Sequence, residues 1–137
     1  MAAIDSNMHT QTQIGAWINT PKPGVTLQIR NDLPIPKPGP GEILIKLLVT
    51  GFCHSDVHSI YGETPMDTNI AGHEGIGSVV GVGPDVSPNV IGKRVGLKWL
   101  YSACGNCEVC QVRSVYCPQQ KNSGRVSHAK HYSDLAW

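Results

Sequence analysis

The sequence predicts a mainly β domain, and two observations carry that prediction. Short apolar runs recur along the chain at residues 14–18, 25–29, 42–49, 75–83 and 90–99. Clusters of Pro and Gly separate them, with 10 Pro and 15 Gly among 137 residues. Strands joined by turns show this punctuation. A chain of this length is expected to form one domain with its own hydrophobic core.

The first third of the chain is expected to build a hairpin and a loop. Residues 1–13 have no periodicity and are expected to be a disordered lead. The runs at 14–18 and 25–29 flank the turn sequence Thr-Pro-Lys-Pro-Gly, which predicts a hairpin. The Pro-rich segment 34–41 favours extended and turn conformations, so we expect an ordered surface loop there.

The middle of the chain is expected to bring chemistry-bearing residues together. The run 42–49 suits a central strand that leads to Cys53. Residues 54–61 predict a short helix, with Ser55 as its N-cap and Asp56 in its first turn. The Gly-rich run 75–83 lacks the G-x-G-x-x-G order of a dinucleotide fingerprint. It therefore predicts a glycine-rich strand at a close backbone approach.

Composition excludes several classes of function. The net charge of +1 gives no basic footprint for nucleic acid. No apolar run is long enough to span a bilayer, and the polar start carries no export signal. With five cysteines and no export signal, metal ligation is favoured over disulfides, and the cytoplasm is the expected compartment.

The segment 51–74 combines the ligand types of an open zinc site. Cys53 and His73 lie far apart in sequence, with no second Cys or His at finger spacing, which favours a catalytic site over a closed structural one. Glu74 could be a third ligand or a nearby base, and Asp56 could orient a ligand imidazole. The plainer alternative is a buried thiol, a core histidine and surface acids. His54 and His58, at i and i+4, could also bind a metal by themselves.

A second candidate site is the cluster Cys104, Cys107, Cys110 and Cys117. Three cysteines at C-x-x-C-x-x-C with a fourth one short loop away predict a closed tetrahedral zinc site. An iron–sulfur cluster and free thiols are the alternatives, although ferredoxin-type spacing places the fourth cysteine three residues on. A zinc ribbon would need a second C-x-x-C knuckle across a longer gap.

These motifs, in this order, resemble the zinc-dependent alcohol dehydrogenases of the medium-chain dehydrogenase/reductase superfamily. The resemblance covers residues 14–125 and rests on Gly-Phe-Cys-His-Ser-Asp-Val-His, Gly-His-Glu-Gly and the four-cysteine segment. It implies a GroES-like partial barrel with a short helix and a four-cysteine zinc lobe. It also implies two Zn²⁺ sites, the catalytic one held by Cys53, His73 and Glu74, and NAD as the cofactor of the complete enzyme.

The resemblance also assigns roles to individual residues. His54 would contact the cofactor pyrophosphate, Ser55 would accept the alcohol proton and His58 would pass it to solvent. Trp99 would line and narrow the substrate pocket. Thr64 stands where the small-alcohol branch often has a bulky aromatic. A helix cap with an exposed histidine is the plainer alternative for Ser55 and His58.

The expected function is therefore oxidation of small primary alcohols to aldehydes with NAD in a complete enzyme, which would form a homo-oligomer. Residues 126–137 depart from the family pattern, and no nucleotide-binding domain follows, so the domain is expected to be incomplete at its C-terminus and inactive alone. The alternatives are a non-catalytic zinc-binding fragment and a polyol- or cinnamyl-type dehydrogenase.

Overall fold

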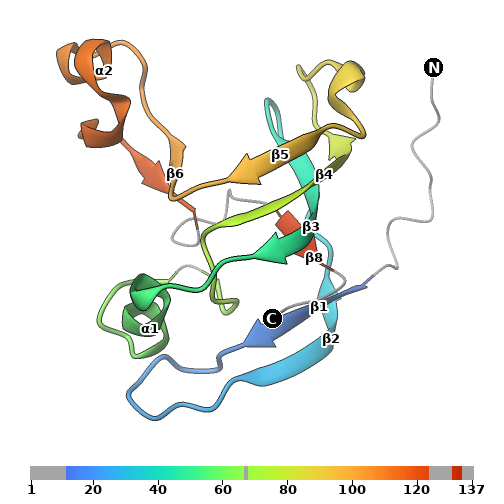
Figure 1. Ribbon diagram of the computed structural model, residues 1–137, viewed down its shortest axis with the longest axis vertical. Coiled ribbons are helices and arrows are strands. Elements are labelled where there is room, and N and C mark those ends of the chain that lie inside the picture. Colours follow the sequence, from blue (N-terminus) through green and yellow to red (C-terminus); the bar gives the residue numbers. More distant parts are fainter. Residues whose placement is uncertain (1–11, 67, 124–130, 134–137) are drawn as a thin grey trace.

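The computed structural model describes residues 12–66, 68–123 and 131–133, and in these the fold is mainly β, as predicted (Figure 1). The longer strands are β1 (Thr12–Trp17), β2 (Gln28–Pro34), β3 (Ile43–Thr50), β4 (Gly75–Val82) and β5 (Arg94–Leu97). The shorter ones are β6 (Leu100–Ser102), β7 (Lys121–Asn122) and β8 (His131–Ser133). The helices are α1 (His54–Ile60) and α2 (Glu108–Val112), with 3-10 turns η2 (Pro88–Val90) and η3 (Ser114–Tyr116).

A four-stranded sheet in the order β5-β4-β3-β8 forms the centre of the fold. β3 pairs antiparallel with β4, which pairs antiparallel with β5, whereas β8 runs parallel to β3. The buried side chains Leu44, Ile45 and Val79 come from β3 and β4. β3 ends at Thr50, three residues before Cys53, and therefore delivers this thiol as the sequence predicts.

The glycine-rich strand β4 lies against the backbone of β3, as expected. Gly77 pairs with Leu47, and a Cβ added to Gly77 would overlap the Lys46 carbonyl oxygen and the Ile45 side chain. Only glycine allows this approach. The close contact fixes the spacing of the strands that lead to Cys53 and away from His73.

The first hairpin is present, but its second strand was predicted at the wrong place. β1 pairs antiparallel with β2, which begins at Gln28 and ends at Pro34 rather than covering 25–29. Residues 25–27 belong to the connection, where the Val25 N–H donates to the Lys22 carbonyl at 3.1 Å. β2 contains the polar sequence Arg-Asn-Asp because most of its side chains are exposed beside β1. Because of this polarity, the hydrophobicity pattern did not indicate a strand at these residues.

Helix α1 packs its inner side against the hairpin end. Ile60 joins Ile18 and Ala71 in a buried cluster, and Val25 and Met66 pack against it. The Ser55 cap prediction is wrong, because Cys53 is the N-cap and the helix begins at His54. Asp56 Oδ2 accepts the Cys53 N–H at 2.8 Å, a bond that Asp56 can make only from the third helical position.

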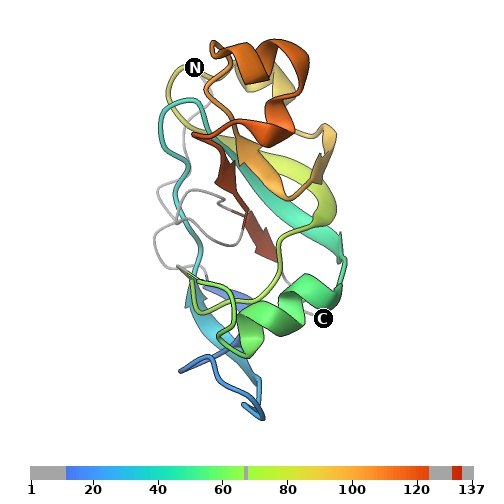
Figure 2. The same ribbon diagram turned by 90° about the vertical axis from the view of Figure 1, so that its left-hand side faces the viewer.

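The predicted strand at 90–99 is shorter than expected. Residues 88–90 form η2, and Pro88 and Gly92 flank the break before β5 begins at Arg94. β5 ends at Leu97, so the chain leaves the sheet before Trp99 and continues into β6. The pair β6–β7 carries the cysteine segment, and in both views this segment and α1 lie at opposite ends of the molecule (Figures 1 and 2).

The ends of the chain are described only in part. β1 begins at Thr12, inside the expected lead, and the remainder of that lead lies outside the described residues. Within the expected atypical tail, the backbone of 131–133 forms β8, and the other tail positions also lie outside the described residues. Among the described helices, none is long and apolar enough to span a bilayer.

Candidate metal centres

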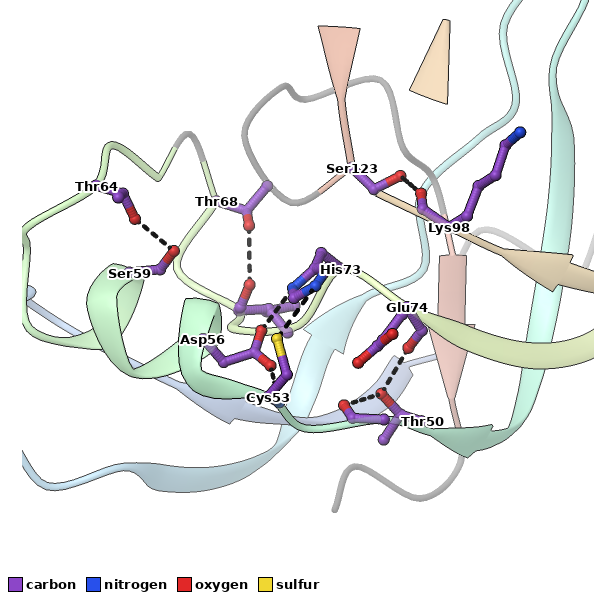
Figure 3. A network of polar contacts seen from close by, with 12 residues as sticks. Thr50, Cys53, Asp56, Ser59, Thr64, Thr68, His73, Glu74, Lys98 and Ser123 are labelled. Atoms are coloured by element: carbon purple, nitrogen blue, oxygen red, sulfur yellow. Dashed lines mark hydrogen bonds and ion pairs between the residues drawn. The ribbon is translucent and has the colours of Figure 1, made fainter. Parts of the chain in front are cut away.

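Cys53 and His73 meet at the N-terminus of α1 (Figure 3). The Cys53 Sγ lies 3.6 Å from His73 Nε2. The other ring nitrogen, Nδ1, donates to Asp56 Oδ1 at 2.8 Å, and Asp56 is 2% exposed. An ionised carboxylate only accepts hydrogen bonds, so this contact places the proton on Nδ1. It leaves the Nε2 lone pair facing the thiol, which is the arrangement of a histidine ligand with an orienting carboxylate.

The separation of these two donor atoms fits a shared zinc ion. With Zn–S of about 2.3 Å, Zn–N of about 2.05 Å and a tetrahedral angle, S and N would stand about 3.5 Å apart. The structure has 3.6 Å. Cys53, Asp56, His73 and Glu74 also offer ligand atoms that all lie within 4.8 Å of one another. The separation of the Cys53 and His73 donors therefore fits a shared zinc ion.

Glu74 is held beside this pair by the ends of β3 and β4. Its carbonyl accepts from Thr50 Oγ1 at 3.0 Å and from the Gly51 N–H at 3.4 Å. A Cβ on Gly51 would stand 2.7 Å from Glu74 Oε1, so the carboxylate occupies the space that a larger residue would fill. The position is suited to a third ligand or to a carboxylate that approaches the metal.

Trp99 lies at the other side of His73. The two rings meet edge to face with centroids 5.0 Å apart. They border a small cavity of about 10 Å³ that Ser59 and Met66 also line. Thr64 is not among the lining residues, and its Oγ1 lies 2.9 Å from Ser59 Oγ. Sequence reasoning found Trp99 and missed Ser59 and Met66, because neither stands in a motif.

The outer residues of α1 include those assigned to the cofactor contact and the proton relay. Ser55 and His54 are exposed, and the rings of His54 and His58 have centroids 4.7 Å apart. His58 Nδ1 pairs with Glu63 Oε2, a partner that sequence reasoning missed. Glu63 follows the helix end, so a helical spacing rule does not reveal it. Among the described contacts, no hydrogen bond joins Ser55 to His58.

A larger groove of about 400 Å³ lies elsewhere, beside the start of β3 and the strand β6. Its lining includes Glu42, Leu100 and Tyr101. The Tyr101 hydroxyl donates to Glu42 Oε1 at 2.9 Å, and burial together with this contact raises the pKa of Tyr101 to about 12. Neither Cys53 nor His73 lines this groove.

The four remaining cysteines converge around α2 and η3. The Cys104 Sγ lies 3.7 Å from Cys110 Sγ and 3.5 Å from Cys117 Sγ, and all four sulfurs lie within 4.8 Å of one another. Backbone hydrogen bonds from Asn106 and Cys107 lower the pKa of Cys104 to about 6, whereas burial raises that of Cys110 to about 12. Backbone N–H groups of Cys104 and Gln119 point at Cys117 Sγ, at 3.5 and 3.4 Å.

These sulfur separations fit one metal ion. A tetrahedral zinc with four bonds of about 2.3 Å separates its sulfurs by about 3.8 Å. In an iron–sulfur cluster the four thiolates are divided among two or more irons, so that thiolates on different irons stand farther apart. The geometry therefore favours a single-ion site, as the spacing predicts. The six residues between Cys110 and Cys117 close it through the end of α2 and η3.

The cysteine lobe, residues 100–123, has almost no apolar core. Its only buried residues are Cys117 and Ser123, while Val112 is 82% and Tyr116 65% exposed. Ser123 ties the lobe to the chain before it through Ser123 Oγ, which donates to the Lys98 carbonyl at 2.7 Å (Figure 3). A segment of this kind lacks hydrophobic stabilisation, and metal binding is the means by which such lobes fold.

Comparison with known proteins agrees with this geometry. Residues 39–131 match the alcohol dehydrogenase GroES-like domain. This chain belongs to that family. Over 105 residues it is 44% identical to an alcohol dehydrogenase of Moraxella sp., a match that covers 74% of this chain and 31% of that protein. An alcohol dehydrogenase of Schizosaccharomyces pombe is 43% identical over 97 residues, or 68% of this chain and 28% of that protein.

Solved structures share the fold. The cobalt- and zinc-bound thermostable alcohol dehydrogenase of Pyrobaculum aerophilum matches with a TM-score of 0.73 and 25% identity, over 88% of this chain and 37% of that one. The acetophenone reductase of Geotrichum candidum, solved in complex with NAD, matches with a TM-score of 0.63 and 32% identity, over 84% and 34%. The chain thus spans about a third of the length of the proteins it matches.

Proposed function

We propose that this chain supplies the zinc-binding catalytic part of an alcohol dehydrogenase that oxidises small primary alcohols to aldehydes with NAD. Cys53, His73 and Glu74 would hold the catalytic zinc, and the four cysteines of the lobe would hold the structural one. The observation that carries the proposal is the 3.6 Å separation of Cys53 Sγ and His73 Nε2.

The residues around this pair have separable tasks. A bound zinc would act as a Lewis acid that polarises the alcohol oxygen. Asp56 holds the His73 tautomer that presents Nε2. Ser55 would accept the alcohol proton, and His58, whose side chain is 44% exposed, would release it to water. His54 is exposed at the start of α1, where it could contact a cofactor phosphate.

Substrate size would be set beside Trp99. The cavity that Trp99 and His73 border has a volume of about 10 Å³, which is room for about one water molecule, so even a short alcohol would have to displace some of the lining. Thr64 is smaller than an aromatic residue and makes its hydrogen bond to Ser59, so it does not close this space from the other side. A polyol- or cinnamyl-type preference is the alternative, and substrate comparison on an active form separates the two.

The isolated 137-residue chain is expected to differ from the complete enzyme in its activity. Hydride transfer requires the nicotinamide in near-attack contact with the alcohol carbon, and such positioning supplies about 7–11 kcal/mol of the barrier. The described residues contain no βαβ unit with a glycine turn to hold a dinucleotide. We therefore expect zinc binding without NAD reduction from this chain in isolation. A non-catalytic zinc-binding role is the second candidate, and the complete cysteine cluster favours it.

A chimera tests the proposal. Residues after Arg125 would be replaced by the corresponding continuation of the Moraxella relative, and NAD reduction would be followed with ethanol and longer primary alcohols. We expect turnover that disappears with Cys53→Ser or His73→Ala. Ser55→Ala should lower kcat more than it changes KM, because it interrupts proton release and leaves the metal ligands in place.

Two outcomes would contradict parts of the proposal. A folded chimera that binds zinc and NAD but oxidises no alcohol would exclude the dehydrogenase assignment. Turnover by the unmodified 137-residue chain would show that it needs no additional nucleotide-binding unit.

A further inference from the structure

The outer side of α1 carries two neighbouring imidazoles that the structure places together. His54 and His58 stand one helical turn apart, and their ring centroids are 4.7 Å apart at an interplanar angle of 62°. His54 is exposed, and the His58 side chain is 44% exposed. Residues at i and i+4 share one face of a helix, which is the spacing at which two histidines bind a single metal ion.

Glu63 fixes one of these rings. After α1 the chain turns at Gly62 (φ +79°), and the Glu63 N–H donates to the His58 carbonyl at 2.9 Å. The Glu63 side chain then reaches His58 Nδ1. Because an ionised carboxylate only accepts, this contact puts the proton on Nδ1 and leaves the Nε2 lone pair of His58 available. Both the backbone and the side chain of Glu63 therefore contact His58.

The same arrangement of a carboxylate behind an imidazole occurs at the buried Cys53–His73 pair. Asp56 accepts from Nδ1 of His73 and leaves Nε2 as the donor, just as Glu63 does for His58. A carboxylate behind a histidine is typical of metal ligands, because it fixes the tautomer and raises the basicity of the other nitrogen. The described part of the chain thus contains two carboxylate-oriented imidazoles, His73 beside Cys53 and His58 beside His54.

We propose that His54 and His58 form a separate, exposed chelate site for a borderline divalent transition metal, with Glu63 as the orienting carboxylate. Imidazole nitrogens suit Zn²⁺, Ni²⁺ and Cu²⁺ and are poor ligands for Mg²⁺ or Ca²⁺. Two protein donors leave the remaining coordination positions to water, so binding is weaker than at the four-cysteine cluster. Occupancy would take up the same His58 nitrogen that a proton relay needs.

Ni²⁺ is the probe for this site, because it is paramagnetic and does not oxidise thiols. Zinc-loaded, ¹⁵N-labelled chain would be titrated with Ni²⁺ while amide signals are recorded. We expect selective broadening of the α1 signals, at residues 54–60. His54→Gln, which retains a good helix former, should weaken Ni²⁺ binding strongly, and the double variant with His58→Gln should abolish it. Glu63→Gln should weaken it by about 10–100-fold, the usual cost of losing an orienting carboxylate.

Asp32→Asn is the matched control. It removes one negative charge from an exposed carboxylate that pairs with Arg30 instead of an imidazole, and it should leave Ni²⁺ binding unchanged. Spectra recorded without Ni²⁺ establish that each variant is folded. The proposal is overturned by absence of broadening at α1, by α1 broadening that persists in the double variant, or by equal weakening in Glu63→Gln and Asp32→Asn.

Discussion

His73 shows how the fold determines the donor atom of a single side chain. Its ring is buried beside Asp56 and Trp99, with Nδ1 bound to the carboxylate and the Trp99 ring in edge-to-face contact at 5.0 Å. Nε2 therefore faces Cys53 Sγ, which lies 3.6 Å away. The same Asp56 also accepts the Cys53 N–H, so one carboxylate positions both ligands.

Asp56→Asn tests this double role. The carboxylate accepts the Cys53 N–H with Oδ2 and the His73 Nδ1–H with Oδ1. In the amide one of these oxygens is replaced by an NH2 group, which faces one of the two N–H donors and cannot accept from it. We expect zinc affinity at the Cys53–His73 centre to fall by about 10–100-fold. A competitive zinc titration should show the weaker binding step displaced and the tighter, four-cysteine step unchanged. An unchanged weaker step would mean that Asp56 does not orient the ligands.

For single residues, the sequence predicted which side chains form the candidate site better than it predicted the hydrogen bonds between them. Cys53, His73, Glu74 and Asp56 form a cluster as expected, because few residue types bind zinc. The N-cap was assigned to Ser55, whereas Cys53 takes that place. Residue propensity favours Ser, but the Asp56 side chain can return only to the backbone N–H three positions earlier.

Among the elements, β3 and β4 do most to position the candidate metal centre at Cys53 and His73. They run antiparallel, so that Cys53 follows the end of one and His73 precedes the start of the other. Their close approach depends on Gly77, which has the Lys46 backbone against its Cα.

Gly77→Ala should therefore destabilise the domain by about 1–3 kcal/mol, the typical cost of forcing an extra methyl into a packed site. Gly96→Ala is the matched control, because Gly96 lies in the adjacent strand β5 and an added Cβ meets nothing within 4 Å. There, reduced freedom of the unfolded chain should leave stability unchanged or raise it by up to about 1 kcal/mol. Denaturant unfolding of both variants checks this, and equal midpoints would contradict the close-contact account.

The sequence located these two strands because both are buried or rich in β-branched residues. It placed β2 three residues too early, since Val25 and Leu27 look more strand-like than Arg30 and Asp32. In the structure Arg30 and Asp32 form an exposed ion pair along β2, with 2.7 Å between Arg30 Nη2 and Asp32 Oδ2. Pairing with β1 determines where β2 begins and ends, and the local hydrophobicity of the sequence does not reveal that pairing.

Over the whole molecule, the two candidate metal centres have different support. The Cys53–His73 centre rests on the sheet and on the apolar cluster of Ile18, Ile60 and Ala71. The lobe has four converging thiols and almost no buried apolar surface. We therefore expect the isolated chain to hold zinc mainly at the lobe, where four donors act together, and less tightly at the open centre.

The most direct measurement is the zinc content of the purified chain and of two variants, determined by elemental analysis after removal of loosely bound metal. Cys104→Ser combined with Cys107→Ser should lose most of the bound zinc, because two of the four thiolates are gone. Cys53→Ser, which removes one thiol from the other centre, should retain most of it. Retention of the full amount by the double variant would contradict the assignment of the lobe as a zinc site.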